Sequence, residues 1–193
     1  RRVRPARVLE TGSLPMRTLL SWPSALSTER LEATGPHGHT MPIQEQSSDE
    51  LVDIARIGFT NLSVSPALQE DALTHLQEWL ERPVFLVYRP QIIAMLKAER
   101  WARILDSFYQ VLPFGTGGRR GRVGIGPNRF NPWTLGMSVQ GHAQWLRREF
   151  GDQEIKVVLA HDVRCFMDLD RQLEPDVPNP LHGLTSRNFA ELA

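Results

Sequence analysis

Apolar residues recur at helical spacing in three stretches between residues 47 and 112 of this chain. The first begins at Ser47, which with Glu50 fits a capping box, where a hydroxyl and a carboxylate each accept a hydrogen bond from an otherwise free backbone N–H. Its apolar positions are Leu51, Ile54, Ala55, Ile57 and Phe59. The pattern predicts an amphipathic helix that starts just after Ser47.

The second and third stretches carry their own start and stop signals. Ser65 and Pro66 are typical of the start of a helix, and Pro83 is expected to end it because proline cannot continue a helix. The apolar stripe of this helix is Leu68, Ala72, Leu73, Leu76, Trp79 and Leu80. The third stretch follows Pro90 and is expected to break near Ala98. Its apolar positions are Ile93, Leu96, Ile104, Leu105, Phe108 and Val111.

The pattern changes at Pro113. Six of the twelve residues from 115 to 126 are glycine, a density at which no regular core element forms, so we expect a loop or tight hairpin with a short strand at 122–125. Asn131 then predicts the cap of a helix that ends at Gly151. Its apolar stripe is Leu135, Val139, His142 or Ala143, and Leu146.

A nearly continuous apolar run at residues 155–160 is typical of a strand buried on both faces of an α/β sheet. The expected fold class is therefore α/β. We expect that sheet to be incomplete, which leaves apolar surface along 155–160 exposed. Residues 165–183 are predicted as a polar, proline-bearing excursion, and a last helix is expected to begin at Thr185 or Ser186.

Charge divides the chain into three segments. The 193 residues carry 22 basic and 22 acidic side chains, yet residues 1–40 have a net charge of +3, residues 41–112 of −4 and residues 113–193 of +1. The first segment is proline-rich and aperiodic, so we expect a disordered or non-native extension. A targeting peptide is disfavoured there because the apolar region is short, and Met41 is an alternative first residue. The second segment is a helical lead-in.

Composition also excludes several classes of protein. A net charge of zero argues against a dedicated nucleic-acid binder. The apolar runs are too short to cross a bilayer, so we expect no membrane partner. The single cysteine, Cys165, excludes an intrachain disulfide and fits a reducing, cytoplasmic setting. The first residue is Arg and the last residues start a helix without a stop signal, so we expect a fragment of a larger protein.

The glycine-rich segment carries the clearest chemistry. Between Pro113 and Phe130 there are four arginines and no acid. Small residues let a ligand approach the backbone, and N–H, hydroxyl and guanidinium groups all favour an oxyanion. Phosphate or another anion is favoured over a purely structural glycine turn. The loop lacks the lysine of the Walker A motif, and Arg120 stands where the dinucleotide fingerprint needs glycine. RNA binding through an arginine–glycine patch remains open, although no aromatic residue interleaves the arginines.

A second candidate site follows the apolar run. Asp162 and Arg164 stand where α/β proteins place functional groups, but a structural ion pair fixing a turn is at least as well supported. The six histidines have no metal-ligand spacing, and His142 is expected to be a core histidine. The chain therefore offers no metal site of its own.

Several motifs in order resemble the α-D-phosphohexomutase superfamily, in its phosphoglucomutase/phosphomannomutase branch that includes phosphopentomutases. FGTGGRRG at 114–121 and GIGPNRFN at 124–131 are similar to that family's loop and hairpin. Gln140-Gly141 matches a helix step, and VVLAHDVR at 157–164 matches a strand. The lead-in matches too, through Tyr88-Arg89-Pro90 and Trp101. The resemblance covers residues 49 to 193.

The resemblance implies an isomerase of carbohydrate metabolism, an intramolecular phosphotransferase with a phosphoserine, a bisphosphorylated sugar intermediate and Mg²⁺. Residues 113–193 would be the incomplete first α/β domain, a mixed sheet with flanking helices. This part would be inactive alone, with the phosphoserine and the Mg²⁺ ligands beyond residue 193. Arg120 and Thr116 match loop positions that face the phosphoserine. The matching phosphate-binding positions are Gly115, Gly117, Gly118, Asn128 and Arg129. The expected substrate is a phosphosugar, with glucose 1-phosphate/6-phosphate as the best guess.

Two departures from the family stand out. Arg119 replaces the usual leucine, and residues 165–183 look like an insertion. Ser186 is not expected to be the nucleophile, because it starts a helix and no His-Asn-Pro follows it. The alternative to a mutase is a non-catalytic phosphate-binding module or a degenerate mutase.

Overall fold

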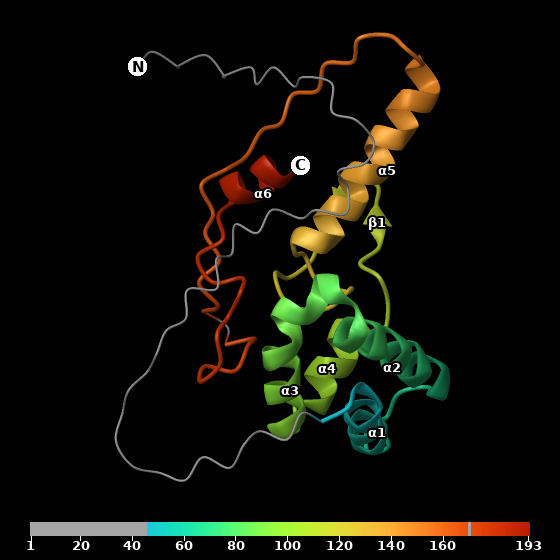
Figure 1. Cartoon of the computed structure of the whole chain (residues 1–193), viewed down its shortest axis with the longest axis vertical. Coiled ribbons are helices and arrows are strands. Elements are labelled where there is room, and N and C mark those ends of the chain that lie inside the picture. Colours follow the sequence, from blue (N-terminus) through green and yellow to red (C-terminus); the bar gives the residue numbers. More distant parts are fainter. Residues whose placement is uncertain (1–45, 170) are drawn as a thin grey trace. The chain divides into compact units, whose positions relative to one another are not determined.

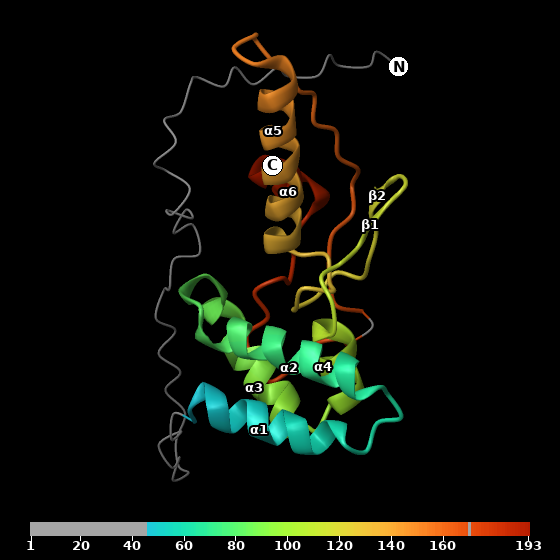
Figure 2. The ribbon, with the colours of Figure 1, turned by 90° about the vertical axis from the view of Figure 1, so that its right-hand side faces the viewer.

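Four α-helices pack together in the first half of the part that the structure describes (Figures 1 and 2). A computed structural model gives residues 46–169 and 171–193, so the expectations for residues 1–40 lie outside it. The helices are α1 (Ser48–Phe59), α2 (Pro66–Glu81), α3 (Arg89–Lys97) and α4 (Trp101–Phe108), with the 3₁₀ helix η1 (Pro83–Tyr88) between α2 and α3. The predicted helices, the capping box at Ser47 and the break at Ala98 are confirmed. The 3₁₀ helix was not predicted.

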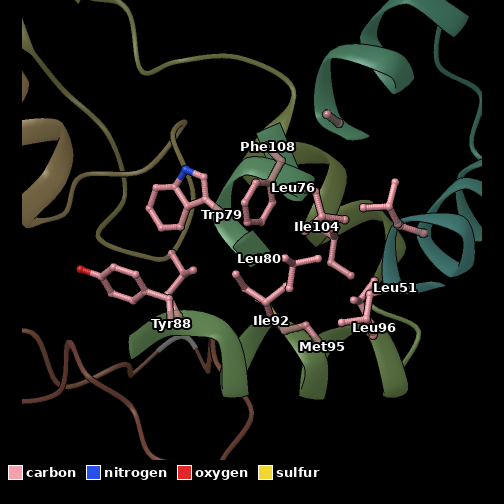
Figure 3. Packing of buried hydrophobic residues seen from close by; sticks show 14 of the residues in the cluster. Leu51, Leu76, Trp79, Leu80, Tyr88, Ile92, Met95, Leu96, Ile104 and Phe108 are labelled. Atoms are coloured by element: carbon pink, nitrogen blue, oxygen red, sulfur yellow. The ribbon is translucent and has the colours of Figure 1, made fainter. Parts of the chain in front are cut away.

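The four helices share one apolar core, in which side chains from each helix point toward one another (Figure 3). The ring of Trp79 stacks on Phe85, with ring centroids 4.2 Å apart. Trp133, in the first turn of α5, meets the edge of Trp79 at 5.8 Å. This aromatic cluster joins the start of α5 to the helical core.

The buried face of α1 differs from the predicted one. Ile57 is 70% exposed, whereas Val52 and Gly58 are buried. The reason is Trp101 of α4, whose ring lies so close to Gly58 that a Cβ there would be 2.3 Å from a ring carbon. The indole therefore packs directly on the glycine backbone and determines which face of α1 turns inward.

Beyond α4 the chain forms a two-stranded hairpin, β1 (Phe114–Gly115) and β2 (Gly118–Arg119), and the long helix α5 (Pro132–Phe150). Asn131 caps α5 and Gly151 ends it, as predicted. The predicted apolar stripe of α5 is not buried, since Thr134 is its one buried residue. His142 is exposed and stacks on Trp145, so the expectation of a core histidine is wrong.

Residues 155–160 do not form the expected strand. They are irregular, and Val158 is 85% exposed. The exposed apolar surface is confirmed, and the missing regular structure has a physical reason. A strand needs a hydrogen-bonded neighbour, and the hairpin β1–β2 is the one sheet in the described residues. The short strand expected at 122–125 is reduced to an isolated bridge between Val123 and Phe130. The described residues are thus mainly helical with a small two-stranded sheet.

Residues 171–183, predicted as part of a polar excursion, are instead docked on the helices together with Leu184. Leu173 and Leu181 are buried in the core, with 5% and 0% exposure. Helix α6 (Ser186–Leu192) follows with Thr185 as its cap, as predicted, and lies against α5. No helix in the described part of the chain is long and apolar enough to cross a membrane.

Candidate functional site

The glycine-rich segment forms a tight antiparallel hairpin. Phe114 and Gly115 of β1 pair with β2, which consists of Gly118 and Arg119, and the exposed pair Thr116 and Gly117 makes the turn. Gly118 has a φ of 102°, a left-handed conformation that residues with a side chain rarely adopt. The sequence therefore needs glycine here for the hairpin to close, and the hairpin presents Thr116 to solvent.

The neighbouring arginines Arg119 and Arg120 reach different parts of the molecule. Half-buried Arg119 directs Nη1 to the carbonyl of Thr134 in the first turn of α5, at 3.4 Å. Exposed Arg120 lies over Gly117, where an added Cβ would be 3.3 Å from its Nη2. Because Gly117 has no Cβ, the guanidinium can lie close to the backbone of the turn. Within the residues that the structure describes, Arg120 has no ion pair and no side-chain hydrogen bond.

Asn128 lies in a buried turn that packs on the end of α4. Its side-chain Nδ2 donates to the carbonyl of Asp106 at 2.8 Å, and its Oδ1 accepts from Gln110 at 3.1 Å. Its backbone N–H donates to the carbonyl of Ser107 at 3.0 Å. Gly126 makes this approach possible, because a Cβ there would be 2.5 Å from the same Ser107 oxygen.

Arg129 is 6% exposed and bonded within the same turn. Its Nη1 donates to the carbonyls of Asp106 and Asn128, both at 3.1 Å. Its Nη2 pairs with Asp106 Oδ2 at 2.5 Å. The guanidinium therefore has protein partners on both terminal nitrogens.

The predicted site residues thus fall into two groups. Thr116, Arg120 and the three predicted glycines form the exposed hairpin, whereas Asn128 and Arg129 belong to the buried turn. No side-chain hydrogen bond or ion pair joins the two groups among the described residues. Their predicted roles in phosphate binding stay predictions.

A second polar cluster surrounds Asp162. Its carboxylate pairs with Arg164 Nε at 2.9 Å and accepts hydrogen bonds from the Arg164 backbone N–H and the Ser186 hydroxyl. The Ser186 hydroxyl, followed by the Arg164 N–H, lowers the pKa of Asp162 below its ordinary value. The suggested pairing of Asp162 with Arg164 is present in the structure. The part played by Ser186, which starts α6, was missed.

Sequence reasoning also missed the partners of the buried turn. Asp106 stands on α4, far from Arg129 in the sequence, and no local pattern links the two. Thr134 left a readable signal, since it stands three residues after Asn131, the spacing of a capping box. In the described residues, no three His, Cys, Asp or Glu side chains are grouped so that they could hold a metal ion. His75 Nδ1 instead bonds to the carbonyl of Phe108 at 2.7 Å.

Comparison with known proteins finds a distant similarity. The chain is 29% identical over 102 residues to a protein of Schizosaccharomyces pombe (strain 972 / ATCC 24843) named "Probable phosphoribomutase". The aligned part is 52% of this chain and 17% of that protein, so the chain spans about one sixth of its length. No family model and no solved structure matches. This distant similarity is consistent with the superfamily resemblance.

Proposed function

We propose that this chain is the N-terminal part of a phosphosugar mutase, an enzyme that moves a phosphoryl group between two oxygens of one sugar phosphate. The observation that carries the proposal is the exposed hairpin, in which the guanidinium of Arg120 rests against the Thr116–Gly117 turn. No acid lies between Pro113 and Phe130 to neutralise this charge. The distant likeness to a protein named as a phosphoribomutase supports the same activity.

The chemistry suits what the hairpin offers. Phosphoryl transfer needs charge neutralisation and positioning far more than covalent help from the protein. Arg120 would hold the phosphate oxygens through its planar fork of N–H donors, and the Thr116 hydroxyl would add a further donor. In this proposal the hairpin is one wall of the site and binds the transferring group.

The proposal gives Mg²⁺ no place in the described residues. Magnesium prefers carboxylate, carbonyl and water oxygens in octahedral geometry, whereas the hairpin offers guanidinium and hydroxyl groups. These residues therefore do not fit the metal. We expect its ligands and the phosphoserine beyond residue 193.

Turnover by the full-length protein encoded by the gene tests the proposal. Glucose 1-phosphate, the expected substrate, is assayed beside mannose 1-phosphate and ribose 1-phosphate, the last because of the name of the similar protein. Each assay contains Mg²⁺ and the matching bisphosphate. Conversion of at least one sugar phosphate is expected, and no turnover of any of them contradicts the mutase.

Anion binding by the 193-residue chain separates a mutase from a non-catalytic phosphate-binding module. We expect inorganic phosphate and glucose 1-phosphate to shift the backbone amide NMR signals of Gly115 to Gly118. The shifts should be lost in an Arg120→Ala variant and kept in an Arg122→Ala control. If the chain binds phosphate but the full-length protein shows no turnover, the non-catalytic phosphate-binding module is supported. If neither binding nor turnover is found, the hairpin serves neither function.

A further inference from the structure

Gln91 of α3 is fully buried, and its amide bonds to the backbone of the docked segment, defined here as residues 171–184. Nε2 donates to the carbonyls of Glu174, Val177 and Pro178 at 2.9, 2.7 and 3.3 Å. Oε1 accepts from the N–H of Glu174 at 2.9 Å. One side chain thus contacts four main-chain groups of a segment more than 80 residues away in the sequence, and the two Nε2 protons are shared among the three carbonyls.

Ion pairs and a further hydrogen bond also hold the docked segment on the helices. The carboxylate of Glu174 accepts from Arg100 Nε at 2.9 Å and lies 4.0 Å from Arg103 Nη1. Arg103 also donates to the carbonyl of Gln172 at 2.8 Å. The docked segment is therefore held by α3 and α4 together.

The far end of the docked segment is paired with the chain near Asp162. Phe166 donates to the carbonyl of Leu184 and accepts from the N–H of Gly183, both at 2.8 Å. The N–H of Ser186 donates to the carbonyl of Arg164 at 2.9 Å. Since the Ser186 hydroxyl binds Asp162, this pairing sets the geometry of the Asp162 cluster.

We propose that Gln91 is a latch that holds the docked segment on the helices and thereby positions Ser186 against Asp162. The coupling runs from Gln91 to the segment backbone, and from the paired end of the segment to Ser186. Loss of the Gln91 amide leaves these part-buried backbone groups without their protein partner, so we expect the segment to leave the helices and regain hydrogen bonds from water. The proposal does not depend on the proposed function.

Substitution of Gln91 by methionine tests the latch in the 193-residue chain. Methionine keeps the length and volume of the side chain but cannot satisfy the four backbone groups. We expect hydrogen exchange at the amides of Glu174, Gly183 and Ser186 to rise by about tenfold or more, while the amides of α2 stay unchanged. A Gln77→Met variant is the matched control. Gln77 bonds only to the exposed side chains of Asp49 and Glu81.

The pKa of Asp162, followed by NMR of its carboxyl carbon, reports whether the Ser186 hydroxyl is still held against this carboxylate. In Gln91→Met it should move up toward the ordinary value, because the Ser186 hydroxyl is no longer held against it. A merely structural role of Gln91 in the core would leave this pKa unchanged. An unchanged pKa of Asp162 therefore overturns the proposal, and so does unchanged exchange in the docked segment.

If Gln91→Met does not fold, native-state exchange of the unaltered chain at low denaturant decides. The amides of Phe166, Glu174, Gly183 and Ser186 should open together, with one free energy that lies below that of α2. Opening of these four amides at unrelated free energies contradicts a latched segment, and so does opening only with global unfolding.

Discussion

Arg129 and Asp106 form an ion pair across the end of α4, with 2.5 Å between Nη2 and Oδ2, and the arginine side chain is 8% exposed while the aspartate is 59% exposed. The pair is uneven, because the arginine also bonds to two carbonyls whereas the carboxylate is open to water. Of the two partners, the guanidinium therefore contributes more bonds to the buried turn than the carboxylate does.

Replacing Arg129 by methionine should lower the free energy of unfolding by about 2–3 kcal/mol, because the carbonyls of Asn128 and Asp106 lose a charged donor. Asp106→Asn should have a smaller effect, of about 1 kcal/mol or less, since its carboxylate is half exposed. Urea denaturation of both variants checks this. Equal losses would mean that the ion pair, and not the carbonyl bonds, holds the turn.

The contact of Gly58 with Trp101 predicts that alanine is not tolerated at position 58. An added Cβ would lie 2.3 Å from the ring, so α1 or α4 must shift, at about 1–3 kcal/mol. Gly141 of α5 is the control, since nothing lies within 4 Å of a Cβ there. Gly141→Ala should stabilise the chain by up to about 1 kcal/mol, through helix propensity. Thermal melting of both variants should therefore shift in opposite directions.

Burial of Tyr88 predicts a loss of stability at high pH. Desolvation raises the pKa of its hydroxyl from 10.0 to about 12 in the folded protein. Between these values the unfolded state loses its proton first, so the free energy of unfolding falls as the pH rises from 10 to 12, by up to about 2–3 kcal/mol. Tyr88→Phe should flatten that part of the pH profile. An unchanged slope would show that the hydroxyl is hydrated.

Asp162 and its partners predict a loss of stability at low pH instead. The folded-state pKa of Asp162 is lowered, so its contribution to stability is present above its unfolded pKa and is lost as the pH falls through the folded pKa. Ser186→Ala removes the largest cause and should raise the pKa of this carboxyl, as measured by NMR titration. A pKa that stays low in this variant would assign the effect to Arg164 instead.

If the proposed function holds, Arg120→Lys in the full-length enzyme should reduce kcat and kcat/KM together, by about 2–4 kcal/mol in transition-state stabilisation. Lysine keeps the charge but loses the planar fork. Arg119→Leu should keep most of the activity, because Arg119 reaches toward α5. Loss of activity in Arg119→Leu together with normal activity in Arg120→Lys would mean that Arg119, and not Arg120, binds the phosphate.

Local signals in the sequence were enough to predict where helices begin and end. Ser47 with Glu50, Pro66, Asn131 and Gly151 act on backbone groups within a few residues, so they determine α1, α2 and α5 without knowledge of the rest of the fold. The hairpin followed in the same way from the density of glycine. The anion-binding role assigned to the hairpin from its composition stays a prediction.

Which faces are buried was decided only by the tertiary structure. Trp101 packs on Gly58 and so determines the inner face of α1. Gln91 binds a segment that its composition had predicted to be a polar excursion, and Asp106 pairs with Arg129. These contacts join residues distant in the sequence, so no local pattern contains them. Residues 155–160 show the converse: their composition favours a strand, but backbone hydrogen bonds come only from a neighbouring strand, and none pairs with them in the described structure.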